Sequence, residues 1–381
     1  MPTMDSTIRL LCDLVAIDSV NPSLVPGAAG ESDIAAAIAV ELRGLGLDVE
    51  MTEAAPERPN VVGILEGSRH GRSLMLCGHI DTVGVAGMKS PFDPVIEDGR
   101  LYGRGAEDMK GGIAAMIGAA RRVVETGGLP GGKLIIAAVA DEEYASVGAE
   151  ALVTRWKADA AVVTEPTDLI IATGHKGFAW VEILVEGIAA HGSRPREGRD
   201  AILRMGRVLT CLEALDRKLQ SRTPHPVMGT SSLHASLITG GRELSTYPDR
   251  CVLQLERRSV IGETGHTALA EVEAILSALQ TEDPELRVQA RLMFDRLPYE
   301  TPPQHFLVPA LEAVLQKAGC APRRGGASFW TDAAVLGHAG IPSVIFGPSG
   351  SGLHSSKEYV EIDQVLLCRD ILAELARSVC V

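Results

Sequence analysis

Leu74-Met-Leu-Cys-Gly-His-Ile-Asp81 is the stretch around which the fold can be predicted. A run of uncharged apolar residues stops at a glycine and is followed at once by a histidine and a carboxylate. Such a run predicts a buried strand that presents His79 and Asp81 just past its carboxyl end. The two residues are two positions apart, so on an extended chain they project to the same side. One could bind a metal while the other orients it.

The composition limits the kinds of partner that this chain can bind. Its length of 381 residues is enough for two domains, and 46% of the residues are hydrophobic but only 4% aromatic, so the cores are expected to be aliphatic. The formal net charge of −13 argues against nucleic acids and anionic membranes as partners, because both repel an acidic surface.

The cysteines and the apolar runs indicate where in the cell the protein is located. The chain has seven cysteines, an odd number, and no C-x-x-C motif, which favours reduced thiols over disulfides. There is no basic segment leading into an apolar one at the start, and no uninterrupted apolar run of about 18 residues. The sequence therefore predicts a cytoplasmic protein that does not enter the membrane.

Two further apolar runs, at residues 133–140 and 160–163, resemble the opening stretch. Both alternate with segments that have helical spacing of apolar residues, such as 32–45, where Ser32 is the predicted N-cap. Strands that are apolar throughout are typical of sheets covered on both faces. The sequence thus predicts an α/β fold with a mostly parallel sheet.

The pattern changes near residue 177. Residues 178–186 alternate between apolar and polar, which indicates a half-exposed antiparallel strand, and the order that follows is β-α-β-β-α-β, as in a ferredoxin-like unit. A proline-rich segment at 297–303 is the expected return linker. We therefore expect a discontinuous α/β domain of residues 1–176 and 297–381, with an α+β domain of residues 177–296 inserted into it.

Polar residues with metal-ligand chemistry follow several of the predicted strands. In open α/β sheets, ligands bind outside the carboxyl ends of the strands, so these residues are expected in one crevice. Crowded carboxylates repel one another and take up protons unless cations are present, and two histidines with carboxylate oxygens suit zinc, with cobalt or manganese as alternatives. The residues are His79, Asp81, Asp108, Glu142, Glu143, Glu165 and His354.

Five segments of the chain resemble the metal-site blocks of the M20 metallopeptidase family. That family includes acetylornithine deacetylases, succinyl-diaminopimelate desuccinylases, aminoacylases and glutamate carboxypeptidases. The blocks occur in the family's order and span almost the whole chain. They are Gly-His-Ile-Asp-Thr-Val at 78–83, Gly-Arg-Gly-Ala-Glu-Asp-Met-Lys-Gly-Gly at 103–112, Asp-Glu-Glu at 141–143, Thr-Glu-Pro at 164–166 and His-Ser-Ser-Lys-Glu at 354–358.

The resemblance implies a zinc-peptidase-like fold with a lid domain, and two zinc ions per chain. It implies that His79 and Glu165 bind one ion and that Glu143 and His354 bind the other. It further implies that Asp108 bridges the two ions and is followed by a cis peptide bond.

The resemblance also assigns roles to the two remaining acidic residues. Asp81 would hydrogen-bond His79, and Glu142 would be the general base that acts on a metal-bridging water. The residue chemistry agrees, since of two adjacent glutamates only the one not bound to a metal can accept a proton.

Two residues of the inserted domain match positions that contact substrate in relatives. His191 would reach into the active site of the partner subunit and stabilise the oxyanion, which implies a homodimer formed through the lid. Arg258 would bind the α-carboxylate of the substrate. The chain departs from relatives at Gly192, where they carry serine, and at Lys357, where they carry aspartate or asparagine.

The leading functional hypothesis is a dinuclear zinc amidohydrolase that cleaves the amide bond of N-acylated amino acids, similar to acetylornithine deacetylase or succinyl-diaminopimelate desuccinylase. A metallocarboxypeptidase or dipeptidase acting on short peptides would use the same chemistry. A non-catalytic binding protein on this scaffold is the alternative from another class, and the complete ligand set with Glu142 argues against it.

Overall fold

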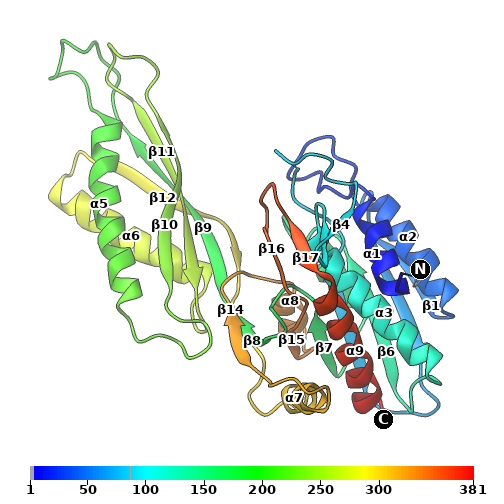
Figure 1. The fold of residues 1–381 in the computed structure, drawn as a ribbon. Coiled ribbons are helices and arrows are strands. Elements are labelled where there is room, and N and C mark those ends of the chain that lie inside the picture. The colour runs from blue at the N-terminus through cyan, green and yellow to red at the C-terminus, as the bar shows by residue number, and fades with distance from the viewer. Residues whose placement is uncertain (1–3, 86) are drawn as a thin grey trace. The chain divides into compact units, whose positions relative to one another are not determined.

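The computed structural model describes residues 4–85 and 87–381, which form two compact units (Figure 1). The larger unit comprises the described residues up to Gly174, together with Thr301–Gly326 and Thr331–Val381. The inserted unit comprises His175–Glu300 and Ala327–Trp330. Each unit has its own sheet and its own hydrophobic core.

The main sheet of the larger unit has the strand order β1-β2-β6-β3-β7-β15-β8, with β14 paired to β8. Its strands are β1 (Asp48–Ala55), β2 (Arg58–Glu66), β3 (Ser73–His79), β6 (Lys133–Val139), β7 (Ala160–Val163), β8 (Ile171–His175), β14 (Arg324–Ala327) and β15 (Ser343–Ile345). The central strands β6, β3, β7 and β15 are parallel, which confirms the predicted α/β class.

The edge formed by β1 and β2 differs from the expected mostly parallel arrangement. These strands pair antiparallel with each other, and β2 pairs antiparallel with β6. Only two residues, Pro56 and Glu57, separate β1 from β2. A connection this short can join only antiparallel neighbours, so the sheet is mixed.

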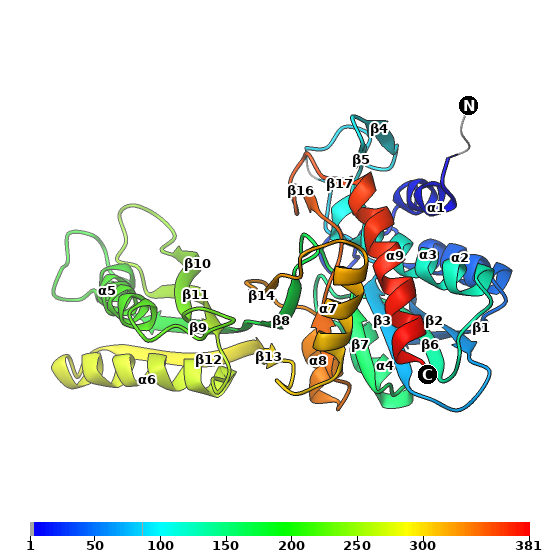
Figure 2. The same ribbon diagram turned by 60° about the horizontal axis from the view of Figure 1, so that its bottom comes forward.

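Helices cover both faces of this sheet (Figure 2). One set packs with Leu74 and Leu76 of β3 in a single core: α1 (Ser6–Val15), α2 (Ser32–Gly44), α3 (Gly111–Glu125), α7 (Leu307–Lys317) and α9 (Ile362–Val379). The other face carries α4 (Val147–Arg155) and α8 (Ala333–His338), which contact each other. Because both faces are covered, every residue of β3 is buried.

A second, smaller sheet of the larger unit has the order β16-β17-β5-β4. Its strands are β4 (Val95–Glu97), β5 (Arg100–Tyr102), β16 (Gly350–Ser351) and β17 (Tyr359–Glu361). The sequence predicts the hairpin of β4 and β5, because Asp98-Gly99 is a favoured two-residue turn; both residues have positive φ angles, 50° and 78°. The pairing of β17 with β5 joins residues more than 250 positions apart and has no local signal.

The inserted unit has the predicted β-α-β-β-α-β order. Its four strands pair antiparallel in the order β10-β11-β9-β12, and two helices pack on one face over residues such as Val181, Ile183 and Leu253. Its elements are β9 (Gly177–Glu186), α5 (Ala201–Gln220), β10 (Ser232–Gly240), β11 (Arg250–Ser259), α6 (Gly265–Glu282) and β12 (Arg287–Arg296). The ferredoxin-like prediction is therefore confirmed.

One capping prediction is wrong. Helix α2 begins at Ser32 itself, and Glu31 occupies the N-cap position without a side-chain bond to the helix. The carboxylate of Glu31 is bonded to Arg58 instead. Among the described residues, no helix is both long enough and apolar enough to cross a membrane.

Candidate metal centre

Three neighbouring parallel strands of the larger unit end beside one another. Strand β3 ends at His79, Glu142 is the third residue after β6, and β7 is followed by Thr164 and Glu165. In the sheet β3 lies between β6 and β7, and all three run parallel. Their carboxyl ends therefore present His79, the Glu142–Glu143 pair and Glu165 at one edge of the sheet.

Asp108 lies at the centre of this cluster, between the two histidines. Its Oδ1 is 3.0 Å from Nε2 of His79, and its Oδ2 is 3.3 Å from Nε2 of His354. The same nitrogen of His354 is 3.2 Å from Oε2 of Glu143, and Nε2 of His79 is 3.7 Å from Oε1 of Glu165. The five residues that the resemblance nominates as ligands thus lie together, and each oxygen of Asp108 faces a different histidine.

Two sets of ligand atoms in the cluster are close enough to hold a metal ion. His79, Asp108 and Glu143 offer atoms within 4.8 Å of one another, and so do His79, Glu142 and Glu165. In the described part of the chain, the buried Oε1 of Glu143 has no hydrogen-bond partner. A buried carboxylate oxygen left without a donor is costly, so a cation at this position would satisfy it.

The pKa shifts in the cluster show how strongly its charges conflict. Burial, reinforced by the neighbouring carboxylates, raises the pKa of Glu143 to about 7 and the pKa values of Glu142 and Glu165 well above the usual range. Hydrogen bonds to Asp108 and Glu143 raise the pKa of His354 to about 10. Divalent cations would replace these protons, and nitrogen and oxygen donors in this number suit zinc.

Asp81 is fully buried and is bonded on two sides. Its Oδ1 lies 3.5 Å from Nδ1 of His79, and that nitrogen is also 3.0 Å from the backbone oxygen of Asp81. Its two carboxylate oxygens accept hydrogen bonds from the backbone N–H groups of Glu142 and Glu143, at 3.1 and 3.2 Å. The sequence does not indicate the hydrogen bonds from the backbone of Glu142 and Glu143. Asp81 therefore fixes the loop that carries both glutamates as well as His79.

Asp108 belongs to an irregular turn, Ala106–Lys110, and its peptide bond to Met109 is cis, as the resemblance implies. The turn is held by Glu358, whose carboxylate accepts hydrogen bonds from the backbone N–H groups of Gly105, Glu107 and Asp108 at 2.9 to 3.1 Å. Sequence reasoning did not assign this role to Glu358. The only sequence feature that pointed to Glu358 was its position in the His-Ser-Ser-Lys-Glu block, four residues after His354.

His191 and Arg258 lie in the inserted unit. The His191 side chain is exposed, and its Nδ1 is 2.8 Å from Oγ of Ser193. Arg258 is partly exposed on β11, where its Nε donates to Oε1 of Glu256 at 2.6 Å and its guanidinium lies 5.3 Å from the ring centre of Phe178. Neither residue belongs to the metal-ligand cluster of the larger unit.

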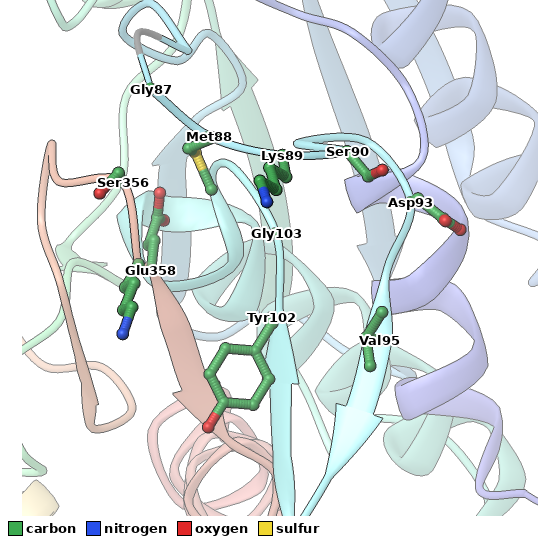
Figure 3. Close-up of a pocket in the computed structure, with 11 residues that line it drawn as sticks. Gly87, Met88, Lys89, Ser90, Asp93, Val95, Tyr102, Gly103, Ser356 and Glu358 are labelled. Carbon is green, nitrogen blue, oxygen red and sulfur yellow. The ribbon is translucent and has the colours of Figure 1, made fainter.

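A cavity of about 450 Å³ in the larger unit lies next to the segment that follows His354 (Figure 3). Its walls include Lys89, Tyr102, Ser356 and Lys357. In the described ranges no acidic side chain pairs with the amine of Lys89 or Lys357. The lining also contains the acidic residues Asp93 and Glu358, so its charge is mixed.

Comparisons with known proteins identify the family. Residues 75–378 match the model of peptidase family M20/M25/M40. The chain is 30% identical over 340 residues to the acetylornithine deacetylase of Myxococcus xanthus, covering 87% of this chain and 86% of the relative. It is also 30% identical over 393 residues to the succinyl-diaminopimelate desuccinylase of Gluconacetobacter diazotrophicus, covering 98% and 96% of the two chains.

Solved structures agree on the fold. The aminopeptidase PepT from Bacillus cereus superposes with a TM-score of 0.81 over 98% of each chain, at 20% sequence identity, a level that speaks for the fold alone. The family match and the two relatives make this protein a hydrolase of amide bonds. By sequence and by fold, the chain belongs to peptidase family M20/M25/M40.

Proposed function

We propose that this protein is a dinuclear zinc amidohydrolase that cleaves the amide bond of N-acylated amino acids. The observation that carries the proposal is the position of Asp108, whose two carboxylate oxygens face His79 and His354 separately. A carboxylate in this position can bind two cations at once. The names of the two relatives support deacylation as the reaction.

His79 and Glu165 would hold one ion, Glu143 and His354 the other, and Asp108 both. Two bound zinc ions, or cobalt or manganese in their place, would polarise the scissile carbonyl and acidify the attacking water.

Glu142 is the proposed general base. It can approach both His79 and Glu165, yet the hydrogen bond of Asp81 engages only its backbone N–H and leaves the carboxylate available. Burial raises the pKa of Glu142 well above that of an ordinary glutamate, which makes its carboxylate a stronger proton acceptor. Glu142 would take a proton from the attacking water and donate it to the nitrogen of the leaving amine.

The inserted unit is the proposed lid and dimerisation domain. Its edge strand β10 exposes Leu237 and Ile238, with 64% and 51% of their surface accessible, and an edge of this kind can pair with a second copy. His191 would then act on the partner's substrate as an oxyanion donor. The seven cysteines are all free, which supports the proposed cytoplasmic location.

Replacing Arg258 by alanine is expected to raise KM about 10- to 100-fold for substrates with a free α-carboxylate, because a charge-assisted hydrogen bond is lost. Steady-state kinetics on free-acid and methyl-ester forms of one substrate measure the effect. Arg291→Ala is the matched control, since Arg291 lies on the same sheet and is paired with Glu182. Equal KM values for acid and ester in the unmodified enzyme would rule out the clamp.

The substrate class is tested by a hydrolysis panel of N-acetyl amino acids, N-succinyl amino acids and dipeptides. We expect kcat/KM to be highest for an N-acyl amino acid. Preference for a dipeptide would instead establish the peptidase alternative, and no hydrolysis of any member with zinc present would contradict the proposal.

A further inference from the structure

A chain of buried polar side chains lies behind the metal cluster, and of its members only Asp81 has a role in the chemistry described above. We call it the Arg58 network; it comprises Asn21, Glu31, Arg58, Asp81 and Asp141. Arg58 is 7% exposed, and the other four are 2% exposed or less. The residues come from the segment before α2, the beginning of β2 and the loops that follow β3 and β6, so the network joins distant parts of the chain.

Arg58 connects the first helices to the loop after β6. Its Nε and Nη2 donate to the two carboxylate oxygens of Glu31 at 2.7 and 2.6 Å, a bidentate pair. Its Nη2 also donates to Oδ1 of Asp141 at 2.7 Å. Asp141 directly precedes Glu142 and has a φ of 70°, a left-handed conformation that is uncommon for residues other than glycine.

Asn21 connects Asp141 to Asp81. Its Nδ2 donates to Oδ1 of Asp141 at 3.0 Å and to Oδ2 of Asp81 at 2.7 Å. Its own backbone N–H donates to the carbonyl oxygen of Thr82 at 2.9 Å, and its Oδ1 accepts from the N–H of Ser23 at 2.8 Å. The amide is thus fixed from both sides and has a single orientation that satisfies all of these contacts.

The network ends on the metal cluster. Asp81 contacts His79 and receives the backbone N–H groups of Glu142 and Glu143. Without Arg58 and Asn21, Asp141 would lose its cationic partner and an amide donor, and Asp81 would lose the amide donor, so part of what compensates their burial would be gone. The side chains of Asp81 and Asp141 would then rotate toward other donors, and the loop that carries Glu142 and Glu143 would move with them.

We propose that Arg58 and Asn21 are positioning residues that hold His79, Glu142 and Glu143 in the geometry required for binding two metal ions. This inference rests on the proposed dinuclear function. It assigns to two residues distant in sequence the task of preorganising the ligands, which in other metal sites changes metal affinity about 10- to 100-fold. Neither residue is one of the five proposed metal ligands.

The test compares Arg58→Met with a matched control, Arg257→Met. Arg257 is likewise buried, 1% exposed, and pairs with two glutamates, Glu263 at 2.9 Å and Glu271 at 3.1 Å, but it lies in the inserted unit. Both variants are expected to lower the melting temperature of the metal-free protein. Only Arg58→Met is expected to weaken zinc binding, about 10- to 100-fold, measured by competition with a chromogenic chelator.

Two further variants keep the inference open to contradiction if Arg58→Met does not fold. Arg58→Lys restores the charge and is expected to recover part of the zinc affinity, and Asn21→Ala, which removes a single amide, is expected to weaken zinc binding and lower kcat more than it changes KM. If every folded variant bound zinc as tightly as wild type, the positioning role would be overturned but the proposed function would stand. Failure of the wild-type chain to bind zinc would overturn the proposed function and this inference with it.

Discussion

Replacing Glu142 by glutamine is expected to lower kcat by about 10²- to 10⁴-fold, the usual contribution of a positioned general base. The amide keeps the size and hydrogen-bonding capacity of the side chain but cannot accept the proton of the attacking water. The metal content should stay at the wild-type level, because Glu142 is not among the five proposed ligands. Steady-state kinetics with the best substrate of the panel, together with elemental analysis, measure both quantities.

The neighbouring Glu143→Gln is the matched control. It makes the same chemical change one residue further along the chain, but Oε2 of Glu143 lies 3.2 Å from Nε2 of His354. We therefore expect Glu143→Gln to lose metal as well as activity. If Glu142→Gln turned over substrate at the wild-type rate, another group would have to be the base.

Removing the metal ions is expected to abolish turnover and to lower the melting temperature. The cations bind only the folded cluster and relieve the repulsion among its carboxylates, so they stabilise the native state. Zinc should restore both properties, and cobalt or manganese should restore turnover. Protein purified without chelator should contain about two ions per chain.

Asp108→Ala tests whether the two sites share a ligand. Because Asp108 faces both histidines, Asp108→Ala should contain less metal than Glu143→Gln, and its activity should fall to background. Asp93→Ala is the control, an exposed aspartate of the same unit that lines the neighbouring cavity. Full metal content in Asp108→Ala would rule out a bridging role for Asp108. In the metal-removal experiment, full activity of metal-free wild-type protein would contradict the metal proposal.

The sequence by itself determines where chemistry-bearing residues enter the fold. The apolar run that begins β3 and its abrupt stop place His79 at a strand end, because a short uncharged run that stops at a glycine is typical of a buried strand. The same reasoning places Glu142, Glu143 and Glu165 after neighbouring strands. The ferredoxin-like order of the inserted unit is equally local, since period-2 and helical patterns follow one another along 120 contiguous residues.

The periodicity of the sequence was not enough to assign chemical roles to the residues of the metal cluster. Spacing alone does not distinguish a metal ligand from a loop carboxylate, and the assignment of Asp108 as bridge and Glu142 as base came from resemblance to a family. The structure adds that each oxygen of Asp108 faces a different histidine. That relation depends on a turn held by Glu358, about 250 residues away along the chain.

Only the tertiary structure identifies the Arg58 network and the pairing of β17 with β5. Glu31 directly precedes the predicted helix of residues 32–45, and nothing in the local sequence around it or around Arg58 indicates that the two side chains form a pair. Likewise, Ala327–Trp330 joins the inserted unit although 26 residues separate it from that unit's main segment. The physical reason is common to these cases: periodicity reports which face of an element is buried, whereas the partner of a buried charge depends on which distant segments the folded chain brings together.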